Sequence, residues 1–516
     1  MKQRSSKLGL AAMMLAAFFT ASAVPAVPAA AAETIPEGVI ASVIVDSVPR
    51  FYYDTKVSGG MTAMWDDALS GKTATIKLYA DWNPENGSRL AREGAGSAFE
   101  GAICVPSGHE VTIDLNGCSI NRGLEAPIED GTVIYIENNA VLNLTDTTAS
   151  SGRCGKITGG NSTNSAGGIQ VEAGGTLNLW GGSIAENQSG ASGGGIVLSG
   201  EGSKLYMTGG SIEHNTAVSN GGGIAMVDAS LEIVSGTIAE NSASGSGGGI
   251  YEQGGSAVLQ GAVISANTSV AGGGICTTEA AALSLRSTAT IQNNIAGSAE
   301  VQGRGGGVLA MSSLPIRLSG SPEISANRQS DGVVSNVTFW VNENESFVGP
   351  RVENDGVTDR AKVGLNFVGG EERELGFAPE WAGVSIFGAD GDFEYILAEG
   401  VQYLRRPART SDYLIYVWIG IGVIVFFALV IAGVAVYHNM QKKKHKQARK
   451  HKKAAAKPSG TQSAAASKSA ASGSAKHADT AMPEPAQVMD ETPTAAKPKP
   501  INKFDLPSTD IPDDES

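Results

Sequence analysis

The chain has 516 residues, of which 67 are glycine and only 17% are charged, and its formal net charge is −14 at pH 7. The charged fraction lies below the usual figure of about 25%, and so much glycine excludes a helical bundle. Residues 33–411 carry 21 basic and 42 acidic side chains, 21 − 42 = −21, which argues against nucleic acid as a partner.

Residues 1–32 have the order of a secretory signal peptide. Three basic residues precede an apolar run from Leu8 to about Val27, and small residues follow up to Ala32. Cleavage after Ala32 is predicted because this charged, apolar and small-residue order is what export signals share. An uncleaved anchor is the alternative. A lead-in and cap at 33–100 would then begin the mature chain.

A repeat dominates residues 101–330. An isoleucine stands three residues before an asparagine six times, and a glycine run followed by isoleucine or valine opens the next unit, as in Gly221-Gly222-Gly223-Ile224. The spacing between copies is 26 to 33 residues, and such self-similarity is the signature of a repeat architecture. The six asparagines are Asn187, Asn215, Asn241, Asn267, Asn294 and Asn327.

Each unit contains three very short stretches in which apolar residues alternate, which predicts short strands. Stacking the units lets each strand pair in parallel with its counterpart about 4.8 Å away. The isoleucines then form successive layers of a thin core, the asparagines lie at one corner and satisfy turn backbone groups, and the glycines lie where the chain bends. The predicted fold is therefore all-β, a parallel β-helix solenoid.

The pattern "GGSIxxN…GGGI" resembles right-handed parallel β-helix proteins of the pectin-lyase-like class. More narrowly, it resembles the repeats of bacterial polymorphic outer-membrane proteins and related adhesin-like surface proteins. The segments 65–82 and 108–120 resemble the N-terminal cap and first coil of that group, and residues 336–404 resemble the irregular end of such helices. Residues 331–411 are therefore expected to form C-terminal coils or a cap and a stalk. The resemblance implies a fold, whereas an activity does not follow from it.

Residues that would support catalysis are sparse in the repeats. Acidic residues from 155 to 327 are scattered singly, and no paired-aspartate motif of a pectin hydrolase occurs. The weak candidates for a metal site are Asp390, Asp392 and Glu394, since alternating acids beside glycine suit Ca²⁺; a solvated turn is the alternative. The sequence predicts no catalytic residue and no cofactor, and it leaves enzymatic activity open.

The sequence contains four cysteines, Cys104, Cys118, Cys154 and Cys276, without CxxC spacing. An exported location permits disulfides. Cys104 and Cys118 are close enough in sequence to meet on neighbouring strands, but spacing alone does not decide the pairing.

An apolar segment at 412–437, "YLIYVWIGIGVIVFFALVIAGVAVY" from Tyr413 to Tyr437, predicts one transmembrane helix. A Lys- and Arg-rich flank follows up to Lys453, so the positive-inside rule places residues 438–516 in the cytoplasm. The last part of that tail has too few large apolar residues to bury a core and is predicted to be disordered. The predicted location is the cell membrane, single-pass, with the ectodomain extracellular.

These observations predict a membrane-anchored bacterial surface protein that acts as a binding or adhesion module. Its partners would be extracellular glycans, matrix proteins or other cells, in addition to the membrane. The alternatives are a carbohydrate-active β-helix enzyme, such as a polysaccharide lyase or hydrolase, and a structural spacer. Ligand identity and oligomeric state do not follow from the sequence.

Overall fold

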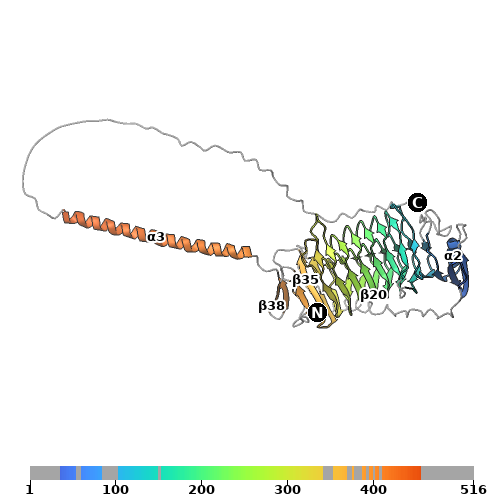
Figure 1. Cartoon of the computed structure of the whole chain (residues 1–516). Helices are drawn as coiled ribbons and strands as arrows, with labels where there is room; N and C mark the ends of the chain where they lie inside the picture. The colour runs from blue at the N-terminus through green and yellow to red at the C-terminus, as the bar shows by residue number, and fades with distance from the viewer. Residues whose placement is uncertain are drawn as a thin grey trace, which may run out of the picture. The chain divides into compact units, whose positions relative to one another are not determined.

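The computed structural model describes residues 35–53, 60–83, 103–148, 153–340, 352–368, 375–376, 386–390, 394–398, 401–405 and 410–454. The predicted signal peptide at 1–32 and the tail beyond 454 lie outside the described residues. Within them, short strands stack one coil upon the next into a parallel β-solenoid of about nine turns (Figure 1). The all-β solenoid expected from the repeat is therefore confirmed.

One coil contains four strand positions. In the coil that begins at Ile196 they are β15 (Ile196–Ser199), β16 (Lys204–Met207), β17 (Ser211–Glu213) and β18 (Thr216–Ala217). Each pairs in parallel with the same position of the next coil, and in two coils the second and third positions fuse into single strands of ten residues, β20 (Ser230–Ala239) and β23 (Ser256–Ser265). The sequence predicted three strands, and the fourth was missed because it is only two residues long.

The same four positions recur along the solenoid. The first is filled by β4 (Ile103–Val105), β7 (Ile134–Ile136), β11 (Ile169–Val171), β15, β19 (Ile224–Val227), β22 (Ile250–Gln253), β25 (Ile275–Thr278), β29 (Val308–Ala310) and β33 (Val337–Trp340). The second is filled by β3 (Thr73–Leu78), β5 (Glu110–Asp114), β8 (Val141–Thr145), β12 (Thr176–Leu179), β16, β20, β23, β26 (Ala282–Leu285), β30 (Ile316–Gly320) and β34 (Val352–Val357).

The third position is filled by β6 (Ile120–Asn121), β9 (Lys156–Thr158), β13 (Ser183–Ala185), β17, the second halves of β20 and β23, β27 (Thr290–Gln292), β31 (Glu323–Ser325), β35 (Lys362–Val368) and β37 (Phe387–Ala389). The fourth forms a separate sheet of β10 (Asn161–Ser162), β14 (Gln188–Ser189), β18, β21 (Ser242–Ala243), β24 (Thr268–Ser269), β28 (Ile295–Ala296) and β32 (Arg328–Gln329).

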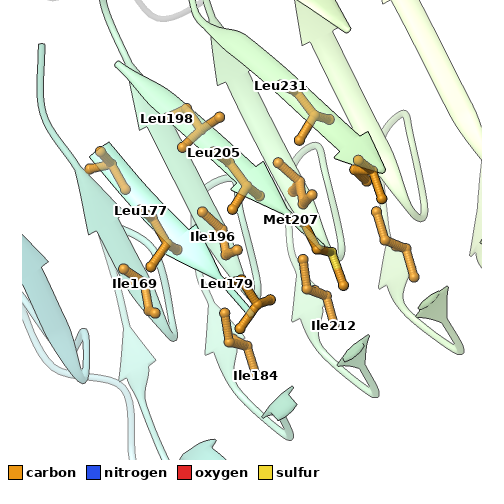
Figure 2. Packing of buried hydrophobic residues seen from close by; sticks show 14 of the residues in the cluster. Ile169, Leu177, Leu179, Ile184, Ile196, Leu198, Leu205, Met207, Ile212 and Leu231 are labelled. Atoms are coloured by element: carbon orange, nitrogen blue, oxygen red, sulfur yellow. The ribbon is translucent and has the colours of Figure 1, made fainter. Parts of the chain in front are cut away.

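The core consists of columns of like side chains. In the third strand position Ile184 pairs with Ile212, and the column continues through Ile238, Ile264, Ile291 and Ile324, each at most 1% exposed. Figure 2 shows the neighbouring columns, in which Leu177 lies beside Leu205 and Ile169 beside Ile196. Because each side chain is covered by its counterparts in adjacent coils, a single coil has no core of its own.

The glycine runs lie where consecutive coils approach most closely. Gly221 has a φ of +66°, a left-handed conformation that glycine adopts without a steric penalty. A Cβ on Gly222 would lie 2.5 Å from the carbonyl oxygen of Gly248, and one on Gly223 would lie 2.7 Å from that of Gly249. The first glycine is therefore required by its backbone conformation and the next two by contact with the neighbouring coil.

The N-terminal end is covered by a small cap. Strand β1 (Val39–Val45) pairs in antiparallel fashion with β2 (Val48–Tyr53) and with β3, and β3 continues the sheet by pairing in parallel with β5. Helix α2 (Gly60–Ala68), which contains the Asp66-Asp67 pair, buries Trp65 fully against the first coils. The ring of Trp65 lies 5.8 Å from that of Trp82.

After the last coils, β36 (Leu375–Gly376), β38 (Glu394–Ala398) and β39 (Val401–Arg405) form a small antiparallel sheet. The long helix α3 (Thr410–Ala454) follows. Its segment Val423–Gln447 is long and apolar enough to span a membrane. At 1.5 Å per residue, the 45 residues of α3 extend over about 67 Å, roughly twice the hydrocarbon thickness of a bilayer.

Candidate functional site

The asparagines of the repeat form a continuous buried hydrogen-bonded column. The side-chain amide of Asn241 donates to the carbonyl of Ile212 at 2.9 Å and to Oδ1 of Asn267 at 3.0 Å. Its own Oδ1 accepts from both the backbone N–H and the side-chain amide of Asn215, each at 3.0 Å. The same pattern connects all six, and each is 0% exposed. The column therefore provides hydrogen-bond partners for the buried backbone groups at this corner of each coil.

The column ends on a carboxylate. Asn327 donates to Oδ1 of Asn336, and Asn336 in turn donates from its backbone N–H and its side-chain amide to Asp390, at 2.6 and 2.9 Å. A carboxylate accepts hydrogen bonds without needing to donate any, so Asp390 ends the series in which each asparagine side chain donates to the next one along the solenoid. Burial raises the pKa of Asp390, and the hydrogen bonds from Asn336 oppose that rise.

Of the three weak metal candidates, Asp390 alone has a side chain that the structure describes. Asp390 is 5% exposed, and both of its carboxyl oxygens accept hydrogen bonds from Asn336. Asp392 lies outside the described residues, and Glu394 begins β38 opposite Arg405. Among the residues described, no group of three or more His, Cys, Asp or Glu side chains could hold a metal ion.

An aromatic and amide-rich surface lies on the outer face of the second strand position. Alternation with the buried leucines directs Asn178 and Tyr206 outward, and Trp180 follows Leu179 on the same side, with all three partly exposed. Tyr206 is the register neighbour of Asn178 in the next coil. We call this surface the Trp180–Tyr206 face; its outward residues form two columns, Asn178, Tyr206, Glu232 and Val258 in one and Trp180, Thr208, Val234, Gln260 and Arg286 in the other.

Hydrogen bonds hold the polar groups of this face in place. Asn178 donates to Oδ1 of Asn143 at 2.7 Å, and Gln260 donates to Oε1 of Glu232 at 2.8 Å. Burial raises the pKa of Glu232, while the hydrogen bond from Gln260 and the charge of Arg286 counteract it. Burial and the nearby Glu232 raise the pKa of Tyr206, so its hydroxyl stays a hydrogen-bond donor at neutral pH.

A second cluster lies at the ends of β7 and β11. Glu137 and Glu172 directly follow the register partners Ile136 and Val171, so their backbones are adjacent in consecutive coils. Glu137 accepts from the thiol of Cys104 at 3.4 Å and from the backbone N–H of Ser107 at 3.0 Å. This brings two carboxylates together that are 35 residues apart in the sequence, which spacing along the chain did not reveal.

The partners of Glu172 complete the cluster. Its Oε1 accepts from Gln170 at 3.1 Å, and Tyr135 also hydrogen-bonds to it. Burial, reinforced by the charge of Glu172, raises the pKa of Tyr135. Each carboxylate thus accepts hydrogen bonds from neighbouring residues. Such bonds fix the orientation of the two side chains and leave them less free to transfer protons.

All four cysteines are free thiols, so Cys104 and Cys118 are not joined. Cys104, Cys118 and Cys276 are buried, and burial raises the pKa of each thiol, that of Cys276 to about 12. Cys154 is the one exposed cysteine of the four. Burial also raises the pKa of the Cys154 thiol, and Asp146 adds to the rise.

The fold defines the class of protein as a parallel β-solenoid followed by one apolar helix that could span a membrane. No family model, no curated protein and no solved structure matches the chain. The pectin-lyase-like and adhesin-like resemblance therefore stays a resemblance of the repeat pattern, and function must be argued from the solenoid's own surfaces.

Proposed function

We propose that the chain is a membrane-anchored surface protein of a bacterial cell whose solenoid binds glycans, matrix proteins or other cells. The observation that carries this proposal is the rigid display of outward side chains in fixed register on stacked parallel strands. Parallel solenoids use such extended surfaces for recognition. The N-terminal signal-like sequence and the basic flank after Tyr437 support an exported solenoid and a cytoplasmic tail.

The topology can be tested with the native cysteines. Intact cells that express the full-length chain are treated with a membrane-impermeant maleimide at mildly alkaline pH. We expect one label, on Cys154, because the other three thiols are buried, and we expect Cys154→Ser to abolish it. Labelling that appears only after the cells are permeabilised would contradict an extracellular solenoid.

Binding is tested with the full-length chain in nanodiscs against glycan arrays, extracellular-matrix proteins and cell surfaces. Saturable binding to at least one of these surfaces, absent from empty nanodiscs, is the expected result. Absence of saturable binding to all of them would overturn the adhesion proposal and leave the spacer role.

The second candidate function is cleavage of a polysaccharide, and the adjacent Glu137 and Glu172 are the observation that favours it. Their backbones are adjacent in consecutive coils, and most glycoside hydrolases use a pair of Asp or Glu carboxyl groups that flank the scissile bond. Incubation of the full-length chain with polysaccharides should then release reducing ends, and Glu137→Gln and Glu172→Gln should each abolish the release. Without such release from the wild-type chain, the cluster is structural.

A further inference from the structure

The Trp180–Tyr206 face combines aromatic rings with hydrogen-bonding side chains. Two partly exposed aromatic rings lie within a field of amide and hydroxyl groups, among them Asn178, Thr208 and Gln260. Aromatic side chains offer large flat apolar areas at low entropic cost, and amides both donate and accept hydrogen bonds. A ring surface with polar edges is the chemistry that sugar rings match, since their C–H faces are apolar and their edges carry hydroxyl groups.

The face is rigid before any ligand arrives. Strand β16 is paired on one side with β12 and on the other with β20, so the backbone beneath Tyr206 is held by hydrogen bonds on both sides. The bond from Asn178 to Asn143 and that from Gln260 to Glu232 fix the polar side chains. Preorganisation of this kind lowers the entropy lost on binding.

Charge argues for a neutral ligand. Glu232 and Arg286 interact with each other, and Lys204, on the same outward side of β16 as Tyr206, adds one positive charge at the edge of the face. Along the same outward side of the sheet, Arg317 pairs with Glu353 at 2.8 Å. The solenoid region as a whole is strongly acidic, with a formal charge of 21 − 42 = −21 over residues 33–411, so it repels polyanions. A locally balanced face on an acidic protein therefore suits an uncharged partner better than an acidic polysaccharide.

The composition of the face also favours a glycan over a protein as its partner. Protein interfaces have an apolar core, and stable ones bury about 800 Å² on each partner. Here Trp180 is flanked by Thr208 and by the amide of Asn178, and the aliphatic side chains in the same columns are limited to Val234 and Val258. The pattern is a narrow strip of alternating polar groups repeated along the stacking direction at about 4.8 Å, which a linear polymer can follow.

We propose that the Trp180–Tyr206 face binds a neutral glycan chain that lies along the solenoid axis. Trp180 and Tyr206 stack on sugar rings, Asn178 and Gln260 bind their hydroxyl groups, and Glu232 positions Gln260 by accepting its hydrogen bond. This inference rests on the proposed binding function and specifies its ligand class and its residues. No bond is made or broken in the ligand.

The test measures binding of the full-length chain in nanodiscs to soluble β-glucan, mannan and galactan, with polygalacturonate as the charged comparison. We expect saturable binding of at least one neutral polysaccharide, with quenching or a shift of tryptophan fluorescence. Trp180→Ala should weaken that binding about tenfold or more and Tyr206→Ala slightly less, in proportion to the loss of stacking. Tyr206→Phe keeps the ring and should retain most of the affinity.

Tyr53→Ala is the matched control, because it removes an exposed tyrosine from β2 in the N-terminal cap and should leave binding unchanged. Trp180→Phe provides a folded variant if Trp180→Ala does not fold. Wild-type affinity in Trp180→Ala and Tyr206→Ala variants that melt like the wild type would overturn the site while leaving the binding function intact. Preferential binding of polygalacturonate, or of protein surfaces alone, would overturn the ligand class.

Discussion

Two buried columns of the solenoid differ in how much the residue type varies from coil to coil. The Ile212 column contains isoleucine in eight consecutive coils, from Ile120 to Ile324. The column of the first strand position that contains Glu252 changes residue in nearly every coil, in the order Leu198, Met226, Glu252, Thr277, Ala310 and Phe339. Both columns are buried, so burial alone does not fix the residue.

The difference lies in what surrounds each column. Ile212 stands three residues before Asn215, next to the asparagine column, and a Cβ on Gly195 of the preceding coil would come within 3.1 Å of its Cγ2. Side chains that meet such close-packed backbone tolerate little change of shape. The other column lies in the first strand position, and its succession of residues of different size is the kind of exchange that a core tolerates when the total volume is kept.

The largest expected effect is at the regular column. Ile212→Asp places an unpaired charge at a position that is 0% exposed, and we expect it to lower the free energy of unfolding by about 5 kcal/mol or more. Denaturant titration of the full-length chain in detergent, followed by tryptophan fluorescence, measures the change.

Glu213→Lys is the adjacent control. It removes the hydrogen bond that the carboxylate of Glu213 accepts from the buried hydroxyl of Ser183 at 2.9 Å, and should cost about 1 kcal/mol. Equal destabilisation by the two variants would contradict the inward and outward assignment of this strand.

The asparagine column comes next in expected effect. Asn241→Ala removes four hydrogen bonds, so the buried backbone N–H of Asn215 loses its acceptor and the carbonyl of Ile212 loses a donor, while the side-chain amide of Asn215 keeps its bond to the carbonyl of Ile184. Because each unsatisfied buried group costs about 1–3 kcal/mol, we expect a loss of about 3–5 kcal/mol in the same titration. Ser242→Ala, one residue along on the partly exposed β21, should stay within about 0.5 kcal/mol. A small effect of Asn241→Ala would mean that water replaces the amide.

These two predictions concern the part of the fold that the sequence already indicated. The Ile-x-x-Asn spacing recurs with the same residue types, so the corner could be read from the chain. Asp390 could not, since it closes the column 54 residues after Asn336 and belongs to no repeat. Trp180 and Tyr206 were missed for a related reason: they come from different coils, and the positions they occupy carry other residues elsewhere.

The irregular column gives a pH-dependent prediction. Glu252 is 0% exposed between Met226 and Thr277, and neither carboxyl oxygen has a hydrogen-bond partner of ordinary geometry. Burial raises its pKa from 4.5 to about 8, although the backbone N–H groups of Ala282 and Ala257 oppose this. The unfolded chain therefore ionises Glu252 at lower pH than the folded chain does, so its contribution to stability declines as pH rises from about 4.5 to 8.

Glu252→Leu restores the apolar residue type found at Leu198 and should remove that decline. We expect its advantage over the wild type to grow by about 1.4 kcal/mol per pH unit between pH 4.5 and 8, reaching about 3 kcal/mol at pH 7, and then to level off. Denaturant titrations at pH 5, 6, 7 and 8 measure it, with Glu279→Gln on the exposed end of the same sheet as the control. If the free energy of unfolding of the wild type did not change between pH 5 and 8, Glu252 would not be the buried acid that makes stability depend on pH.

The smallest expected effect tests the corner's backbone rather than its side chains. The residue before each asparagine has a left-handed φ, and Ala266 is one of these, at +55°. L-residues other than glycine pay about 1–2 kcal/mol for this conformation, and the greater freedom of glycine in the unfolded chain offsets part of the gain. We therefore expect Ala266→Gly to stabilise the fold by about 0.5–1 kcal/mol. Ala239→Gly, within β20, should instead destabilise it by a similar amount. The same sign for both variants in denaturant titration would show that the left-handed corner is not under steric strain.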